Sequence, residues 1–178
     1  FKYQLRLAAL YNLSLILFSF IYLLLGILAI VAAIRYTVGN SAYGYRGFGD
    51  LFVFIFFGLV SVIGVYGLYA PYIFWQIIPL AMGIGLLSVA VLNLNNMRDH
   101  ENDQKVGKNT VVVKMGFANA KIYHSALILI ACFCFSYCSI WFGGFSPLVI
   151  VLCVPLLFHL KRVLETEEPR LLDPELKK

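Results

Sequence analysis

Long stretches without a charged side chain constrain what this chain can fold into. Residues 7–34 and residues 51–97 contain no Asp, Glu, Lys or Arg. A helix of about 20 apolar residues is long enough to cross the hydrocarbon core of a bilayer, so the first stretch can hold one such helix and the second can hold two. The mean hydropathy of +0.85 and the charged fraction of 13% favour an integral membrane protein and exclude an ordinary soluble domain.

The breaks between apolar segments extend this pattern to the whole chain. Pro71 interrupts the second stretch, because the residue before a proline is disfavoured in a helix, and Gly143, Gly144 and Pro147 mark a later turn. No segment shows the alternation of apolar and polar residues that is typical of a barrel strand. We therefore predict a single membrane domain over residues 1–178, an all-α, multi-pass transmembrane helical bundle with about five spans: residues 13–34, 51–69, 72–96, 121–142 and 147–160.

The distribution of basic residues predicts the orientation of this bundle in the lipid bilayer. With five spans, the loops at 35–50 and 98–121 and the tail from residue 161 lie on the same side. They hold every Lys and Arg except Lys2 and Arg6, and all 9 acidic residues. Cytoplasmic loops carry the excess of Lys and Arg, so we place this side in the cytoplasm. The net charge of +5 then reflects topology and requires no nucleic-acid partner.

A dense polar stretch, residues 93–110, follows the second uncharged run. Charged groups at the centre of a bilayer cost about 2.5–3.5 kcal/mol each, so the stretch is expected at the membrane surface or in a wet cavity. On a continuous helix, Asn96, Asp99 and Asp103 would share one face. Two carboxylates and an amide on one face present hard oxygens, which suit Mg²⁺ bound through carboxylates and substrate phosphate.

The basic residues of the polar stretch are divided between a helix and a loop. Gly107 is expected to end the helix, which leaves Lys108 in a loop from which it can reach a phosphate. Arg98 and Lys105 fall on a different side of the helix from the carboxylates, and Glu101 stands in the favourable i,i+4 position to support Lys105. Each of these cations also has an ordinary alternative role, as positive charge that flanks a membrane span.

Other interpretations compete with a metal site in the polar stretch. An acidic cluster after an apolar helix is often a solvated loop without a ligand. A calcium-binding loop needs Gly and Glu at its sixth and twelfth positions, where this chain has Gln104 and Thr110, so we exclude it. A transporter stays open as a second class of function, although transporters usually place acids near the middle of the bilayer and these acids follow a complete apolar span.

Two blocks of the sequence together match a pattern of one family of membrane enzymes. The first block reads Asn95-Asn96-Met97-Arg98-Asp99-x-x-x-Asp103-x-x-x-Gly107-Lys108-x-Thr110. The other block reads Tyr36-Thr37-Val38-Gly39, then Tyr43-Gly44-Tyr45-Arg46-Gly47-Phe48-Gly49-Asp50. The first resembles the second Asp-rich motif of the UbiA superfamily of aromatic prenyltransferases. Both blocks are most similar to the branch that acts on 1,4-dihydroxy-2-naphthoate in menaquinone synthesis, and the resemblance covers nearly all of the chain.

This resemblance implies a reaction. A polyprenyl diphosphate loses diphosphate, and the ring of 1,4-dihydroxy-2-naphthoate attacks the allylic cation and loses its carboxylate as carbon dioxide, which gives demethylmenaquinol. Asp99 and Asp103 would be the catalytic residues and would hold the cofactor Mg²⁺. The other implied contacts are those of the diphosphate with Arg46, Asn96, Lys105 and Lys108, and those of the aromatic acceptor with Tyr36 and Tyr43. The alternative within the family is a different aromatic acceptor.

The resemblance also bears on what part of an enzyme this chain represents. Family members carry two Asp-rich motifs that face each other across a helical chamber, and these residues contain only the second. The chain also begins at Phe1 without a Met. We therefore expect the C-terminal part of a UbiA-like prenyltransferase, without the N-terminal helices that carry the first motif. The expected setting is the bacterial inner membrane, with the active site facing the cytoplasm.

Overall fold

The backbone is mostly helical in the part of the chain that its computed structural model describes, residues 2–37, 42–70, 72, 74–141 and 147–176. In chain order the elements are α1 (Lys2–Thr37), the 3₁₀ helix η1 (Tyr43–Arg46), α2 (Gly49–Val53), the π-helix η2 (Phe54–Val60), α3 (Ser61–Tyr69), α4 (Ile77–Arg98), α5 (His100–Lys105), α6 (Val111–Met115), α7 (Phe117–Trp141), α8 (Pro147–Glu165), the 3₁₀ helix η3 (Pro169–Leu172) and α9 (Asp173–Leu176). No strand occurs in these residues, which confirms the predicted all-α fold.

Four helical segments of the described chain are long and apolar enough to cross a membrane: Ile16–Tyr36, Gly49–Tyr69, Ile77–Arg98 and Phe117–Trp141. They correspond to the first four predicted spans, and the third begins at Ile77 instead of residue 72. The fifth predicted span coincides with α8, which is helical but is not among the four. The predicted breaks at Pro71 and at residues 143–144 lie outside the described residues.

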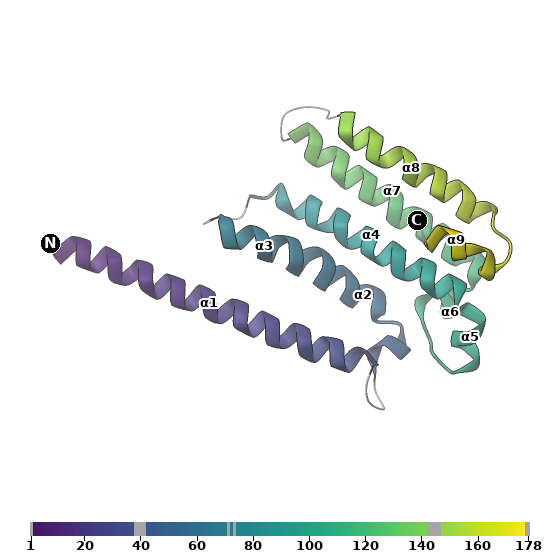
Figure 1. Cartoon of the computed structure of the whole chain (residues 1–178), viewed down its shortest axis with the longest axis horizontal. Coiled ribbons are helices and arrows are strands. Elements are labelled where there is room, and N and C mark those ends of the chain that lie inside the picture. Colours follow the sequence, from purple (N-terminus) through teal and green to yellow (C-terminus); the bar gives the residue numbers. More distant parts are fainter. Residues whose placement is uncertain (1, 38–41, 71, 73, 142–146, 177–178) are drawn as a thin grey trace.

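Helix α4 is the centre of the bundle. Figure 1 shows α2–α3, α4, α7 and α8 side by side in that order, and α4 contacts η2 on one side and α7 on the other. Val89 and Ala90 of α4 are buried against Leu127 and Ile128 of α7. Because α4 is packed on both sides, its C-terminal end, where the polar stretch begins, has a fixed position in the bundle.

A second apolar cluster closes the end of the bundle next to the polar stretch. Met97 of α4 packs there with Val112 of α6, Val163 of α8 and Leu172 of η3. All four side chains are completely buried. The last helical turns of the chain are therefore packed against α4 instead of extending into solvent, and Figure 1 shows α9 close to the end of α4.

Glycines allow two helices to approach α4 closely. A Cβ atom added to Gly58 of η2 would lie 2.6 Å from the Cα atom of Gly85 in α4, so the two backbones are in direct contact. On another face of α4, a Cβ atom on Gly83 would lie 2.7 Å from the ring of Phe135 in α7. Gly85 and Gly83 therefore permit close packing of η2 and α7 against α4.

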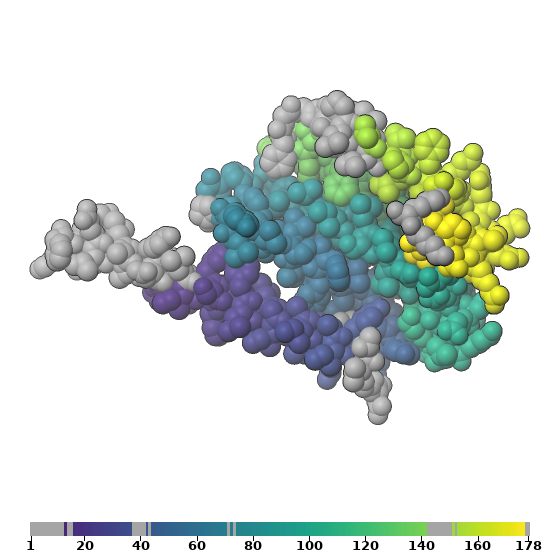
Figure 2. Space-filling model, in the orientation of Figure 1, coloured from purple at the N-terminus to yellow at the C-terminus, as the bar shows by residue number. Residues whose placement is uncertain are grey.

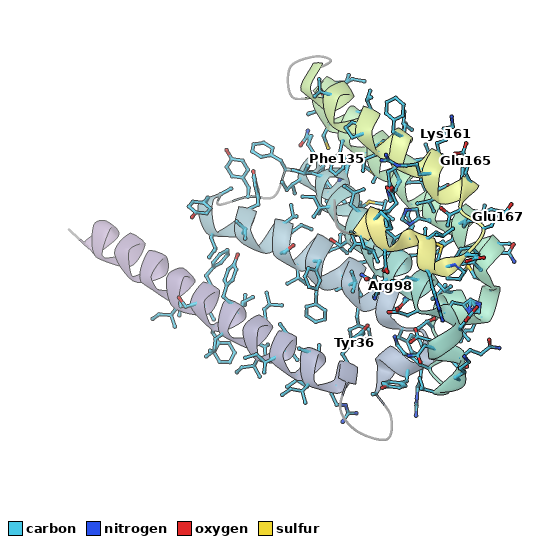
Figure 3. All side chains as sticks on the ribbon, turned by 45° about the vertical axis from the view of Figure 1, so that its right-hand side comes forward. Tyr36, Arg98, Phe135, Lys161, Glu165 and Glu167 are labelled. Atoms are coloured by element: carbon cyan, nitrogen blue, oxygen red, sulfur yellow. The ribbon has the colours of Figure 1, made fainter. Side chains whose placement is uncertain are left out.

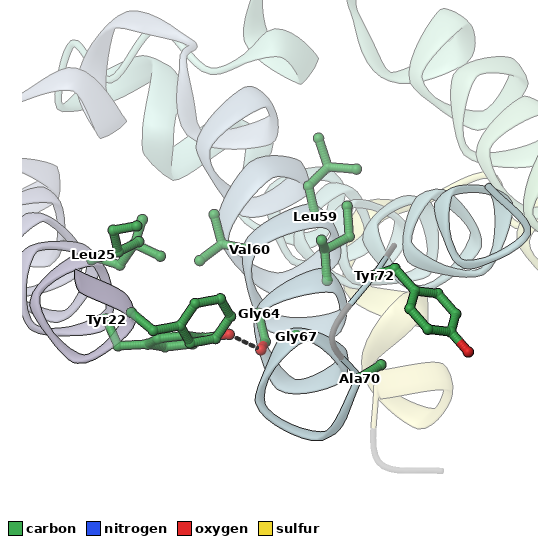
Figure 4. Close-up of a pocket in the computed structure, with 11 residues that line it drawn as sticks. Tyr22, Leu25, Leu59, Val60, Gly64, Gly67, Ala70 and Tyr72 are labelled. Atoms are coloured by element: carbon green, nitrogen blue, oxygen red, sulfur yellow. Dashed lines mark hydrogen bonds between the residues drawn. The ribbon is translucent and has the colours of Figure 1, made fainter. Parts of the chain in front are cut away.

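Helix α1 lies at the edge of the bundle (Figure 2), and most of its described apolar side chains, at position 13 and at positions 16–36, are exposed. An apolar groove runs between α1 and the η2–α3 helix. One part of the groove, of about 710 Å³, lies beside Tyr36 and Phe52, and a second part, of about 500 Å³, lies beside Tyr22. In the second part the Tyr22 hydroxyl donates a hydrogen bond to the Gly64 carbonyl, as Figure 4 shows. The groove is lined almost entirely by apolar atoms and suits a hydrocarbon ligand.

Candidate active site

The polar stretch does not continue α4 as one helix. Helix α4 ends at Arg98, and α5 begins only after Asp99, whose φ of −90° and ψ of 4° lie in the bridge region. The prediction of one continuous helix through Asn96, Asp99 and Asp103 is therefore wrong, since Asp and Asn favour helix caps over helix interiors. That the three side chains share one face stays a prediction. Backbone hydrogen bonds span the break, from Asp99 to Asn95 at 3.0 Å and from Asp103 to Asp99 at 2.8 Å. Asp103 still follows Asp99 by one turn.

The Asp99 carboxylate is bound by the arginine that precedes it. Nε of Arg98 donates to Oδ1 of Asp99 at 2.7 Å and Nη2 donates to Oδ2 at 2.8 Å, which makes a bidentate pair. This hydrogen bonding holds the pKa of Asp99 below its usual value, so the carboxyl group is ionised at neutral pH. The prediction that Arg98 lies on a different side from the carboxylates is wrong, because the break at Asp99 lets neighbouring side chains meet.

Asp103 is buried and is paired with a lysine from the following loop. Nζ of Lys108 donates to Oδ2 of Asp103 at 3.0 Å, and the Asp103 side chain is only 7% exposed. The chain leaves α5 at Gly107, as predicted, with a left-handed φ of +72°. The Lys108 amide donates to the Asp103 carbonyl at 2.8 Å and the Gly107 amide donates to the Gln104 carbonyl at 3.2 Å, which are the two bonds of a Schellman motif. Lys108 lies in a loop as predicted, but its ammonium group is bound to Asp103.

The tyrosine-rich block of the sequence lies against the loop that follows α5. The Asn109 amide donates to the Tyr45 carbonyl at 2.9 Å, and Nζ of Lys114 donates to the Arg46 carbonyl at 2.7 Å. Gly47 has a φ of +87°, and a Cβ atom there would lie 2.8 Å from Nζ of Lys114. Two blocks that are distant in the sequence therefore form one loop region near the end of α4.

The other predicted site residues are more dispersed. Asn96 is buried in α4, whereas Lys105 is exposed on α5. Arg46 contacts this region through its backbone carbonyl, which accepts from Lys114. Tyr36 lies near the end of α1, where it lines the apolar groove instead of the polar region (Figure 3). The side chain of Tyr43 lies outside the described residues.

A polar cavity of about 400 Å³ opens beside Asp99. Arg98, Asp99 and Lys105 line one side of it. Arg170 and Asp173 line the other side and belong to residues 169–176, which we call the C-terminal segment (η3 and α9). Figure 3 shows Arg98 beside this segment. Glu101 also lines the cavity, so three cations and three carboxylates surround it, an arrangement that suits a metal ion joined to a multiply charged anion.

A buried polar cluster holds the C-terminal segment to the bundle. Nδ1 of His159 donates to Oε2 of Glu175 at 2.8 Å, and Nε of Arg162 pairs with Oε1 of Glu175 at 3.0 Å. Nε2 of His159 also lies 3.0 Å from Nε2 of His124 in α7. The Glu175 side chain is 7% exposed. The cluster therefore ties α7 and α8 to α9, and sequence patterns did not identify it.

The donor set of the site fits a Mg²⁺ ion that is shared with a ligand. Asp99 and Asp103 supply carboxylate oxygens on successive turns. In the described part of the chain, no group of three or more His, Cys, Asp and Glu residues is placed to hold a metal. Mg²⁺ commonly takes one or two carboxylates from a protein and completes its coordination with water and substrate phosphate. The two aspartates fit this mode and do not make a cage formed by protein alone.

The sequence of the chain is similar to those of known proteins. The model of the UbiA prenyltransferase family matches residues 5–171. The chain belongs to the UbiA prenyltransferase family. It is 46% identical over 154 residues to the 1,4-dihydroxy-2-naphthoate octaprenyltransferase of Haemophilus influenzae, which covers 85% of this chain and 50% of that protein. It is 42% identical over 164 residues to the protein of the same name from Escherichia coli. This match covers 88% of this chain and 52% of that protein.

More distant UbiA relatives match over shorter ranges. The UbiA prenyltransferase domain-containing protein 1 of Dictyostelium discoideum is 34% identical over 111 residues, which cover 60% of this chain and 32% of that protein. No solved structure matches the chain. The chain spans about half the length of the two bacterial relatives. The resemblance of the two sequence blocks to the UbiA family is confirmed, and with its apolar helices the chain is an integral membrane protein.

Proposed function

We propose that this chain forms the part of a UbiA prenyltransferase that carries the second Asp-rich motif. The protein transfers a polyprenyl group from polyprenyl diphosphate to 1,4-dihydroxy-2-naphthoate in menaquinone synthesis. The observation that carries this proposal is Asp99 in a polar cavity, with Asp103 one helical turn further on, in a chain that is 46% identical to a relative named for that reaction.

The residues of the site have different roles in binding a diphosphate. Asp99 and Asp103 would hold Mg²⁺, which when bound neutralises negative charge on the leaving diphosphate oxygens. Lys105 and Arg170 line the cavity and bind the outer phosphate oxygens. Lys108 neutralises the buried Asp103 carboxylate and has further donors for a phosphate, because an ammonium group carries three N–H donors.

The apolar groove suits the other end of the donor substrate. It lies between α1 and η2–α3, and Tyr36 and Phe52 line the part nearest the tyrosine-rich loop. A polyprenyl chain in this groove buries its hydrocarbon surface against apolar side chains. Tyr36 then stands between the groove and the loop that contacts the polar stretch, which supports its proposed role near the aromatic acceptor.

We propose further that the remaining ligands for metal and diphosphate come from a first Asp-rich motif, which residues 1–178 do not contain. The arrangement of Lys and Arg supports a site on the cytoplasmic face of a bacterial inner membrane. Residues 1–178 expressed alone should then transfer no prenyl group, and a separately expressed segment with the first motif should restore transfer. Robust Mg²⁺-dependent transfer by residues 1–178 alone would contradict the two-motif arrangement.

The test of the reaction uses membranes that contain the intact protein, Mg²⁺, a labelled polyprenyl diphosphate and a choice of aromatic acceptors. We expect labelled product with 1,4-dihydroxy-2-naphthoate, and severe loss of turnover in Asp99→Asn and Asp103→Asn at unchanged expression. Glu165→Gln removes an exposed acid that does not line the cavity and serves as the control. Prenylation of 4-hydroxybenzoate alone would refute the acceptor, and solute movement in liposomes without prenyl transfer would favour a transporter.

A further inference from the structure

One guanidinium group is shared between the Asp-rich stretch and the C-terminal segment. Nε and Nη2 of Arg98 hold the two oxygens of Asp99. Nη1 of the same side chain lies 3.8 Å from Oδ1 of Asp173. Arg98 is therefore within ion-pair distance of two carboxylates, one in the proposed metal site and one outside it.

The position of Asp173 is set by the fold on both sides. The preceding residue, Leu172, is completely buried in the cluster that contains Met97. Two residues after Asp173, Glu175 is buried and bound by His159 and Arg162. Asp173 is held between an apolar anchor and an ionic anchor, so its place beside Arg98 belongs to the packed structure and does not depend on a freely moving tail.

A cation on Asp99 changes which of the two carboxylates Arg98 pairs with more favourably. In the structure, both oxygens of Asp99 accept hydrogen bonds from Arg98. A divalent cation bound to the same carboxylate would stand close to the positive guanidinium, and like charges at such a distance repel each other strongly in a partly buried site. The repulsion falls if Arg98 moves away from Asp99. Among the described residues, the carboxylate already placed to receive it is that of Asp173.

We propose that Asp173 is a positioning residue that draws Arg98 away from Asp99 when Asp99 binds a divalent cation. This inference rests on the metal-binding role of Asp99 in the proposed function. Asp173 lines the cavity, and in this role it acts through Arg98 and is not a ligand of the cation. With an uncharged side chain at position 173, Arg98 stays on Asp99 and the cation binds less tightly.

The test is a titration of the detergent-purified intact protein with Mn²⁺, in which free Mn²⁺ is followed by electron paramagnetic resonance. Asp173→Asn keeps the size of the side chain and removes its charge. We expect it to weaken Mn²⁺ binding about two- to fivefold, the range for an exposed ion pair. Asp173→Glu should bind Mn²⁺ like the wild type. Glu167→Gln, an exposed acid before the C-terminal segment, is the matched control and should also leave binding unchanged.

A second background separates positioning from general damage to the fold. In Arg98→Gln there is no guanidinium to move, so adding Asp173→Asn should cause no further loss of Mn²⁺ affinity. In the wild-type background, Asp173→Asn should raise the Mg²⁺ concentration for half-maximal transfer and leave kcat at saturating Mg²⁺ unchanged. The proposal is overturned if Asp173→Asn binds Mn²⁺ with wild-type affinity. It is also overturned if Asp173→Asn lowers the Mn²⁺ affinity by the same factor in the Arg98→Gln background as in the wild type.

The Mn²⁺ titration does not depend on which substrate the protein uses. If the protein fails to prenylate 1,4-dihydroxy-2-naphthoate but shows the expected Mn²⁺ pattern, the proposed function is refuted and the role of Asp173 stands. If the wild-type protein prenylates the naphthoate but Asp173→Asn binds Mn²⁺ normally, the role of Asp173 is refuted and the proposed function stands. A wild-type protein that binds no Mn²⁺ overturns the inference.

Discussion

Replacing Gly58 with alanine tests the contact that fixes α4 against η2. The added Cβ atom would lie 2.6 Å from the Cα atom and 3.0 Å from the amide nitrogen of Gly85, and 2.8 Å from the carbonyl oxygen of Ala81. Ordinary van der Waals contact begins at 3.4 Å. All three neighbouring atoms belong to the backbone, so no side-chain rotation relieves the overlap and the two helices must separate by most of an ångström. Overpacking of this kind typically costs about 1–3 kcal/mol.

The measurement is reversible unfolding in mixed micelles with increasing sodium dodecyl sulfate, followed by the fluorescence of Trp75 and Trp141. Gly26→Ala is the matched control, since Gly26 lies in α1 and no atom lies within 4 Å of its added Cβ. Alanine is a better helix former than glycine by about 1 kcal/mol, so this control should not lower the stability. Wild-type stability in Gly58→Ala, or equal destabilisation by both changes, would refute the close contact between η2 and α4.

Three further changes test the polar stretch and the topology. Lys108→Met leaves the buried Asp103 carboxylate without its cation and should lower the free energy of unfolding by about 1–3 kcal/mol in the same titration. Lys108→Arg keeps the charge and should lower it less. Equal effects of the two changes would argue against the ion pair. Gly107→Ala forces a left-handed alanine and should cost about 1–2 kcal/mol, and a neutral effect would contradict the Schellman turn. In a protein without native cysteines, a single cysteine at position 108 should react with a thiol label only from the cytoplasm, and one at position 144 only from outside. Labelling of both positions from the same side would contradict the predicted five-span topology.

The uncharged runs of the sequence were sufficient to predict the membrane helices. A long apolar run leaves few alternatives to a spanning helix, so the first four predicted spans agree with the structure to within a few residues at most ends. Gly107 was also predictable as a helix end, because the left-handed conformation that its turn requires favours glycine. These features depend on local composition or on the backbone freedom of one residue.

The pairing of Arg98 with Asp99 could not be predicted from spacing. Neighbouring side chains on a continuous helix do not face each other, and the pair forms because α4 ends at Arg98. The position of that end depends on how the polar stretch packs against the rest of the bundle. The packing of the C-terminal segment could not be predicted either, because a charged tail with two prolines is typical of a solvated end. Its anchor, Leu172, is buried in a cluster with side chains from α4, α6, α7 and α8.

The two acids of the C-terminal segment should differ in their effect on stability. Asp173 is more than half exposed at its side chain and meets Arg98 at 3.8 Å, so Asp173→Asn should cost less than about 1 kcal/mol. Glu175 is buried and bound by both His159 and Arg162, so Glu175→Gln should cost about 1.5–3 kcal/mol, the range for hydrogen bonds to charged groups.

The same unfolding titration measures both changes, and hydrogen exchange of residues 169–176 shows whether the segment detaches. We expect faster exchange in Glu175→Gln, because the ionic anchor is lost, and unchanged exchange in Asp173→Asn, because Leu172 and Glu175 still hold the segment. If Asp173→Asn loosened the segment as much as Glu175→Gln, Asp173 would be a structural contact. Its effect on Mn²⁺ binding would then follow from a displaced segment instead of from the position of Arg98.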